Sequence, residues 1–186
     1  MYLPSTLIPS SSGRGAVISW VVPKTASAPR RLAVAVRDGR GYWVTHVLPS
    51  PGGRAGLVAP AISGAQVSVW WTVSGPKGTS IYLQHHRSGP WNKPVLVHRY
   101  RPGVKISNLV AALHGTRHIV AWTALPNGYQ GSHISRIRFT RGDRVVAAAL
   151  SARETVLAAA ASGRHLALLS TRKVPGKKAA MVVRLR

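Results

Sequence analysis

The sequence predicts an all-β protein built from about four repeats of roughly 50 residues, and three observations support that prediction. First, four blocks of 23 residues align without a gap, at successive offsets of 50, 52 and 47 residues. Second, each block holds two apolar runs around a connection rich in Pro, Gly, Ser and Lys, which is typical of a β-hairpin. Third, further short apolar runs flank the blocks. The blocks span residues 15–37, 65–87, 117–139 and 164–186.

The number of apolar runs in each repeat predicts its architecture. The first run of a block is apolar on both alternating faces, as expected for a strand covered on both sides. The second run is interrupted by Gln84, Arg136 and Arg184, so we expect it nearer the surface. About four strands per repeat indicate the blades of a β-propeller, which stack face to face and bury their inner strands. The flanking runs are residues 57–64, 109–115 and 156–163 before the blocks and 43–48, 94–98 and 144–150 after them.

The repeats also predict how the chain is organised. We expect a single β-propeller-like domain over residues 1–186, in which the last repeat lacks its fourth strand. Residues 2–5 resemble the end of a fourth strand, so the N-terminus either completes the last blade of a four-bladed ring or is a cut through a larger ring. We favour a partial propeller, which a homodimer or blades from a longer chain would complete. The repeats lie at about residues 6–55, 56–107, 108–154 and 155–186.

One stretch gives conflicting signals. Residues 143–163 are rich in alanine, a residue that favours helices and is depleted in strands. The repeat alignment places strands in the same stretch, and we give the alignment the greater weight.

Charge restricts the function more than any motif does. The chain has 26 Lys and Arg against 3 Asp and Glu, a formal net charge of +23, and Asp38, Asp143 and Glu154 are its only carboxylates. Most glycosidases need a carboxylate pair at the scissile bond, and oxygen-ligand cation sites need several carboxylates. With no cysteine and no fitting histidine spacing, the sequence predicts no metal and no cofactor. No run of 18 apolar residues predicts a transmembrane helix, and residues 1–13 lack the basic start of a signal peptide.

The same charge predicts a polyanionic ligand. A strong positive field raises the local concentration of polyanions, and the planar guanidinium of arginine binds phosphate, sulfate or carboxylate bidentately. Tyrosines in loops would add flat apolar contacts to sugar rings or bases. An anionic glycan or cell-surface polysaccharide is favoured, and nucleic acid is an alternative ligand. The candidate ligand-binding residues are Arg99, Tyr100, Arg101, Arg136, Arg138, Arg141 and Tyr129.

Two turns resemble the Asp-box (BNR) repeat of sialidase-like propellers, Ser-x-Asp-x-Gly-x-x-Trp. The first copy keeps Asp38 and, five residues later, Trp43, and the second keeps Gly89 and Trp91 without the Asp. The third repeat has lost the motif. The resemblance implies a turn-forming role for Asp38 and packing into the blade for Trp43 and Trp91.

The resemblance also implies an alternative function and a location. Sialidases generally use three arginines, a Tyr–Glu pair and an acidic Asp, but no local motif matches these roles to positions in this sequence. We therefore assign no catalytic residue and read Glu154 as a surface charge. The leading hypothesis is a non-catalytic module that binds an anionic polymer, and the alternative is a fragment of a sialidase-like glycoside hydrolase. The resemblance favours a secreted or cell-surface protein.

Overall fold

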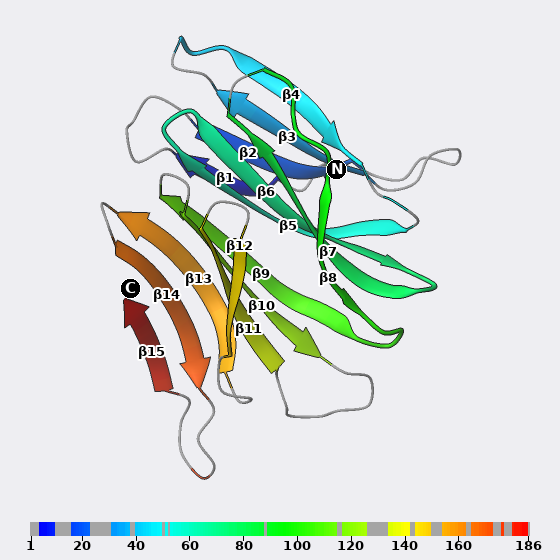
Figure 1. Ribbon diagram of the computed structural model, residues 1–186, viewed down its shortest axis with the longest axis vertical. Coiled ribbons are helices and arrows are strands. Elements are labelled where there is room, and N and C mark those ends of the chain that lie inside the picture. Colours follow the sequence, from blue (N-terminus) through cyan, green and yellow to red (C-terminus); the bar gives the residue numbers. More distant parts are fainter. Residues whose placement is uncertain are drawn as a thin grey trace. The chain divides into compact units, whose positions relative to one another are not determined.

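The fold is made of consecutive antiparallel β-sheets (Figure 1). The computed structural model describes residues 4–9, 16–22, 31–37, 40–49, 51, 53–87, 89–114, 117–125, 134–141, 144–149, 154–162, 165–172, 176 and 180–185. Every regular element in these ranges is a strand, which confirms the predicted all-β class. The same ranges contain no helix that is long and apolar enough to cross a membrane.

Four sheets follow one another along the chain, and each contains the strands of one predicted repeat in sequence order. The first is formed by β1 (Pro4–Pro9), β2 (Ala16–Val22), β3 (Arg31–Arg37) and β4 (Trp43–Leu48). The second is formed by β5 (Arg54–Ser63), β6 (Gln66–Gly75), β7 (Gly78–His86) and β8 (Val95–Tyr100). The third is formed by β9 (Lys105–His114), β10 (Arg117–Leu125), β11 (Ile134–Arg141) and β12 (Arg144–Ala149). The last contains β13 (Glu154–Ser162), β14 (His165–Arg172) and β15 (Ala180–Leu185) among the described residues.

The sheets refine three sequence-based expectations. Strands β12 and β13 occupy the alanine-rich stretch, as the repeat alignment predicts. Strand β1 pairs with β2, so residues 4–9 form the first strand of the first sheet and not the fourth strand of the last. The later sheets begin at Arg54, Lys105 and Glu154, one to three residues before the predicted repeat boundaries.

A register shift recurs near the start of the first strand in all four sheets. Each pairing of a first strand with a second strand contains one extra residue in the first strand, as in a β-bulge. In the second sheet the Leu57 N–H at this shift donates to Thr72 Oγ1 over 2.9 Å. A methyl group on Gly56 would lie 2.7 Å from the same oxygen, so the missing side chain makes room for that contact. The repeats therefore share an irregularity as well as a strand order.

The chain forms two compact units, residues 1–102 and 103–186, and each repeats one packing arrangement. In the first unit β5 packs against β1, β2 and β3, and in the second unit β13 packs against β9, β10 and β11. The first strand of one sheet thus covers the preceding sheet. The prediction of a single domain stays a prediction.

The core of the first unit lies between its two sheets. The Trp71 indole is fully buried there, and its Nε1–H donates to the carbonyl of Pro49 over 3.2 Å. Its ring stacks on Tyr82, with centroids 5.6 Å apart. Strand β6 is buried on both faces, as the sequence predicts, but β7 is also buried, and Gln84 is only 4% exposed. The second apolar run of this repeat is therefore more interior than the sequence indicates. The core residues are Val17, Leu32, Val34, Leu48, Ala55, Val58, Ile62, Val67, Val69, Trp71, Val73 and Tyr82.

Replacing the core indole should destabilise the first unit strongly. We expect Trp71→Ala to lower the free energy of unfolding by about 3–5 kcal/mol, because it removes a buried aromatic side chain and leaves a cavity. Trp43→Ala is the matched control, since Trp43 is 45% exposed. Urea unfolding followed by circular dichroism measures both changes. Equal losses for the two variants would contradict this account of the core.

Candidate anion-binding site

One row of paired residues crosses all four strands of the second sheet. Arg54 pairs with Ser74, Ser74 with Thr79, and Thr79 with Tyr100. The hydroxyl groups of Ser74 and Thr79 are hydrogen-bonded over 3.2 Å, which ties the two central strands together. The start of β5, the β6–β7 turn and the end of β8 therefore lie at the same end of the sheet.

Gly78 brings the β6–β7 turn against the end of β8. Its φ of +105° lies in the left-handed region that side chains other than glycine rarely adopt. A methyl group on Gly78 would lie 2.7 Å from the carbonyl carbon of Arg101 and would also collide with the carbonyl oxygen of Tyr100. The absence of a side chain thus lets the two backbones touch. As a result, Lys77 in the turn lies beside the basic residues that end β8.

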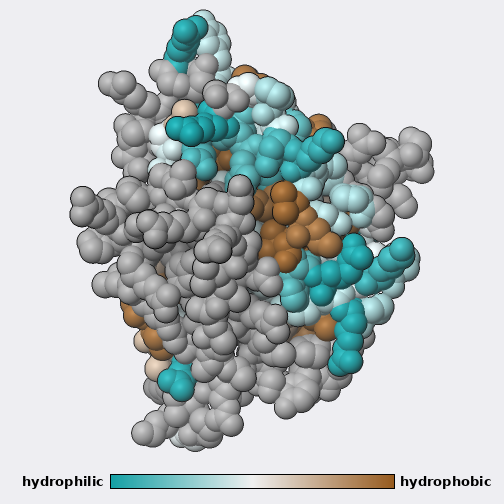
Figure 2. Space-filling view, viewed as in Figure 1, coloured by the Kyte–Doolittle hydropathy of each residue, from teal (hydrophilic) through white to brown (hydrophobic). Residues whose placement is uncertain are grey.

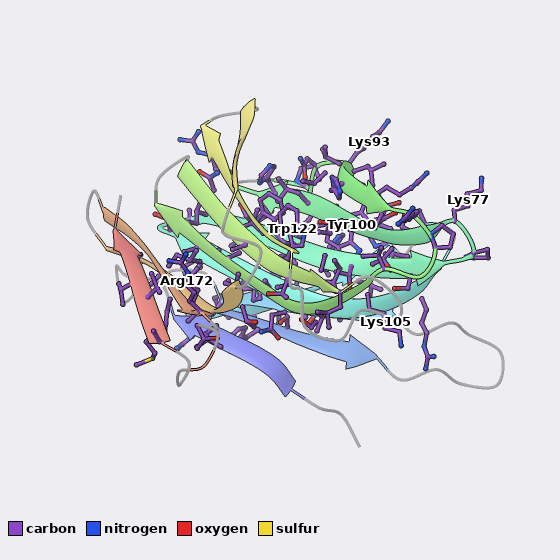
Figure 3. The ribbon with its side chains drawn as sticks, turned by 90° about the horizontal axis from the view of Figure 1, so that it is seen from below. Lys77, Lys93, Tyr100, Lys105, Trp122 and Arg172 are labelled. Atoms are coloured by element: carbon purple, nitrogen blue, oxygen red, sulfur yellow. The ribbon has the colours of Figure 1, made fainter. Side chains whose placement is uncertain are left out.

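This end of the sheet carries only positive charge. Arg54, Lys77, Arg99 and Arg101 are all exposed, and residues 39–142 contain no Asp or Glu. Figure 3 shows the Lys77 side chain extending away from the sheet. Such a cluster attracts anions because no carboxylate of the same sheet neutralises it. We call Arg54, Lys77, Arg99, Tyr100 and Arg101 the basic end.

Two members of the basic end are held in place by side-chain contacts. The Arg99 Nε–H donates to Ser80 Oγ over 3.1 Å, and Ser80 is buried. The half-buried ring of Tyr100 meets His98 edge to face, with centroids 4.3 Å apart. Both contacts limit the number of conformers of these side chains. The basic end therefore holds one ordered guanidinium group, that of Arg99, and one ordered aromatic ring, that of Tyr100, and these two side chains leave β8 on opposite faces.

The opposite end of the second sheet is closed by a structural turn. Gly89 has φ +78°, and Trp91 packs against the core of the first unit. Asn92 closes the turn, because its Oδ1 accepts the His85 N–H over 2.6 Å and its own N–H donates to the His85 carbonyl over 3.1 Å. The Gln84 amide donates to the Asn92 carbonyl over 2.5 Å. Asn92, which the sequence analysis missed, therefore forms the backbone contacts of this turn, which has no Asp.

Trp91 lies against two histidines from different sheets. Its ring stacks on His46 of β4, with centroids 4.8 Å apart and planes 9° apart, and on His86 of β7, with centroids 5.2 Å apart. Burial lowers the pKa of His46 below its usual value, the side chain of Gln84 raises it in part, and the nearby His86 lowers it further. His46 Nε2 and His86 Nδ1 are buried and make no hydrogen bond within the described protein. Burial beside Trp91 therefore favours the neutral form of the His46 imidazole.

The predicted ligand-binding residues fall into three groups. Arg99, Tyr100 and Arg101 lie together at the basic end, where they join Arg54 and Lys77, which the sequence analysis did not select. The sequence does not predict that Arg54 and Lys77 lie near Arg99 and Arg101, because their proximity depends on the register of four strands. The backbones of Arg136, Arg138 and Arg141 lie in β11, opposite β12, but their side chains fall outside the described residues. Tyr129 also falls outside them.

The predicted turn residues differ in their environment. Asp38 lies outside the described residues, so the first Asp-box copy is described only from Arg40 onward. Trp43 is 45% exposed, whereas Trp91 is half-buried and packs on the core. The Arg37 Nε–H donates to the carbonyl of Gly41 over 3.4 Å in the first of these turns. The structural role of Asp38 and Trp43 stays a prediction.

The chemistry that these side chains support is binding by charge and by hydrogen bonds. The part of the chain that the structure describes contains no group of three or more His, Cys, Asp or Glu side chains that could hold a metal ion. At the basic end the available groups are guanidinium and ammonium donors with one phenol ring. Guanidinium and ammonium groups in general form charge-assisted hydrogen bonds with carboxylate, sulfate and phosphate.

Comparison with known proteins supports the fold. No protein-family model and no curated protein matches the chain. Among solved structures, the sialidase of Trypanosoma rangeli in complex with sialic acid matches with a TM-score of 0.64 and 11% sequence identity. A neuraminidase-like protein from A/bat/Guatemala matches with a TM-score of 0.57 and 9% identity. Both alignments cover 98% of this chain.

The fold is sialidase-like. This confirms the predicted likeness to sialidase-like propellers and the prediction of β-propeller blades, while the Asp-box motif itself stays a prediction. The chain spans 36% of the length of the sialidase and 60% of the length of the neuraminidase-like protein. At these identities the likeness concerns the fold alone.

A side chain at position 78 should damage both the fold and the basic end. We expect Gly78→Ala to cost about 1–3 kcal/mol of unfolding free energy, because the backbone there is strained for any other residue and the methyl group collides with β8. Gly64→Ala is the control, since Gly64 also has positive φ (+57°) but a methyl group there meets nothing within 4 Å. Thermal unfolding of the two variants measures the difference. An equal effect would show that the close approach to β8 has no cost of its own.

Acid should destabilise the first unit through His46. Because the folded-state pKa of His46 lies below its unfolded value of about 6.5, the unfolded chain binds the proton more readily. Its contribution to stability is complete above that unfolded pKa and is lost as the pH falls through it toward the folded pKa. Urea unfolding between about pH 8 and pH 5 should show this loss, and His46→Gln should reduce it. If the free energy of unfolding of His46→Gln fell with pH as steeply as that of the wild type, His46 would be excluded as the cause of the pH dependence.

Proposed function

We propose that the chain is a non-catalytic module that binds an anionic polymer, with an anionic glycan as the favoured ligand. The observation that supports this proposal is the basic end, where four exposed cations and the half-buried Tyr100 lie at the same end of one sheet. A polymer that carries repeated carboxylate or sulfate groups could contact several of these cations at once. The neighbouring Tyr100 ring would provide a flat apolar contact.

Two features favour a glycan over nucleic acid. Single-strand nucleic-acid binders usually combine charge with several exposed aromatic side chains on which successive bases stack. At the basic end the aromatic contribution is the half-buried Tyr100, and the exposed Tyr42 and Trp43 belong to the first sheet, not to the sheet of the basic end. The sialidase-like fold also appears in a protein that was solved in complex with sialic acid.

A sialidase-like hydrolase fragment is the second candidate, because the solved neighbours include a sialidase. Glu154 begins β13 and pairs with Arg172 in the strand register. A fluorogenic sialoside tests this candidate directly. Turnover by the wild-type chain that Glu154→Gln abolishes would overturn the non-catalytic proposal, and the absence of turnover under conditions where heparin binds would support it.

Reversing charge at the basic end should weaken binding to a sulfated glycan. We expect Lys77→Glu/Arg101→Glu to reduce affinity for a heparin fragment at least about tenfold at low salt, because two cations at the ligand become repulsive. The matched control is Arg87→Glu/Lys93→Glu, which makes the same charge change at the opposite end of the sheet. Titration followed by fluorescence anisotropy or calorimetry measures both.

The competing outcomes are distinguishable. Equal losses in the two double variants would show that net charge, and not the basic end, determines binding. Absence of heparin binding by the wild-type chain at about 50 mM salt would end the polyanion proposal, because Coulomb attraction is least screened there. Tighter binding to single-stranded DNA than to heparin at matched salt would replace the glycan by nucleic acid.

A further inference from the structure

Strand β4 differs from the other outer strands in its sequence. In the described part of the chain, the last strands of the other three sheets each contain an arginine: Arg99 in β8, Arg144 in β12 and Arg184 in β15. Strand β4 reads Trp-Val-Thr-His-Val-Leu and contains no Lys, Arg, Asp, Glu or Pro. Charges and prolines are the devices that keep sheet edges from pairing with other chains. The edge of β4 has none of them.

Strand β4 is also unusually apolar on its exposed surfaces. Successive side chains point to opposite faces, so Trp43 and Val47 share one face with Thr45, and Val44 lies on the other. Trp43, Val44 and Val47 are 45%, 63% and 47% exposed. Burial increases along the face that carries Val44, His46 and Leu48, and Leu48 is only 1% exposed. The strand therefore presents apolar side chains on both faces at its beginning.

The outer edge of β4 is open in the described structure. Its six residues pair with β3 from Arg37–Trp43 to Leu32–Leu48, and no described strand pairs with its other side. A row of unpaired peptide groups flanked by apolar side chains is the surface that an added strand uses. The peptide groups would supply affinity, and the side chains on the two faces would select the sequence of the added strand.

Charge selects the kind of strand that fits. Exposed Arg37 and Arg40 lie next to the start of β4; Asp38 stands between them in the sequence, so these three residues have a net charge of +1 (two cations and one anion), and residues 39–142 add no further carboxylate. Figure 2 shows hydrophilic side chains around a hydrophobic patch on the face of the molecule that it displays. A second copy of the chain would bring another formal charge of +23 to the same edge and would be repelled. An acidic partner would be attracted.

We propose that β4 binds an extended acidic segment of a partner protein by strand addition. The segment pairs with up to six residues of β4 and alternates acidic and apolar side chains, so that its apolar face contacts Trp43 and Val47 and its acidic face lies on the side of Val44. This surface and the basic end are separate proposals, because strand addition requires peptide N–H groups and a glycan has no strand to add.

A peptide and its N-methylated form test the proposal. The probe is a short fluorescein-labelled peptide in which Glu and Val alternate, and the second probe has the same sequence with every peptide nitrogen methylated. Both carry the same charge, but only the first can donate ladder hydrogen bonds. We expect the wild-type chain to bind the unmethylated peptide at least about tenfold more tightly. Equal binding of the two peptides would overturn strand addition and leave charge attraction alone.

Matched variants locate the binding edge. We expect Val44→Glu/Val47→Glu to weaken binding of the unmethylated peptide about tenfold or more, through lost apolar contact and charge repulsion. The control is Val95→Glu/Leu96→Glu on β8, which replaces residues that are 49% and 44% exposed and makes the same charge change. Equal losses in the two variants would overturn the assignment to β4.

The oligomeric state tests whether a second copy of the chain, and not an acidic partner, pairs with the edge of β4. Light scattering after size exclusion is expected to show no difference between the wild-type chain and Val44→Glu/Val47→Glu. A wild-type dimer that this variant converts to a monomer would show that a second copy occupies the edge, and would overturn the acidic partner. Because all four substituted positions are exposed, circular dichroism should show the same fold in both variants and the wild type.

Discussion

The structure depends on the burial of strands on both faces. A strand such as β6 cannot be stable when only one face is covered, because its Trp70 and Trp71 point to opposite sides and both are fully buried. In the first unit the preceding sheet covers one side of this repeat, with β5 laid against β1, β2 and β3. In the second unit β13 packs against β9, β10 and β11 and covers that sheet in the same way. Repetition of the sequence is therefore a packing requirement, since each repeat needs a neighbour.

The sequence predicts this architecture well because its signal comes from alignment and not from local propensity. The alanine-rich residues around β12 and β13 favour a helix when taken alone, yet each aligns with strands of other repeats and is a strand. Local patterns fail where tertiary contacts decide the outcome. Gln84 reads as a surface residue, but its amide bonds to the Asn92 carbonyl and it is buried beneath the Trp91 turn.

The candidate site is less predictable for a geometric reason. Arg99, Tyr100 and Arg101 form a visible cluster in the sequence, but Arg54 and Lys77 join them only because four strands are in a particular register. A shift of one residue in any pairing would move these side chains to other positions and faces. The sequence does predict a turn at Gly78, because a glycine after Pro-Lys favours one. The sequence does not predict that this turn contacts the end of β8.

The shortage of carboxylates has a consequence for the folded state itself. A compact chain with a formal charge of +23 repels itself, and only three acidic residues offset that repulsion. Dissolved salt would screen the repulsion within the chain and so stabilise the fold. It would also screen the attraction between the chain and a polyanion and so weaken binding. A multivalent anion that associates only with the folded chain would act as a concentrated counterion and stabilise it by mass action. Such an anion would then contribute to the electrostatic balance on which folding depends.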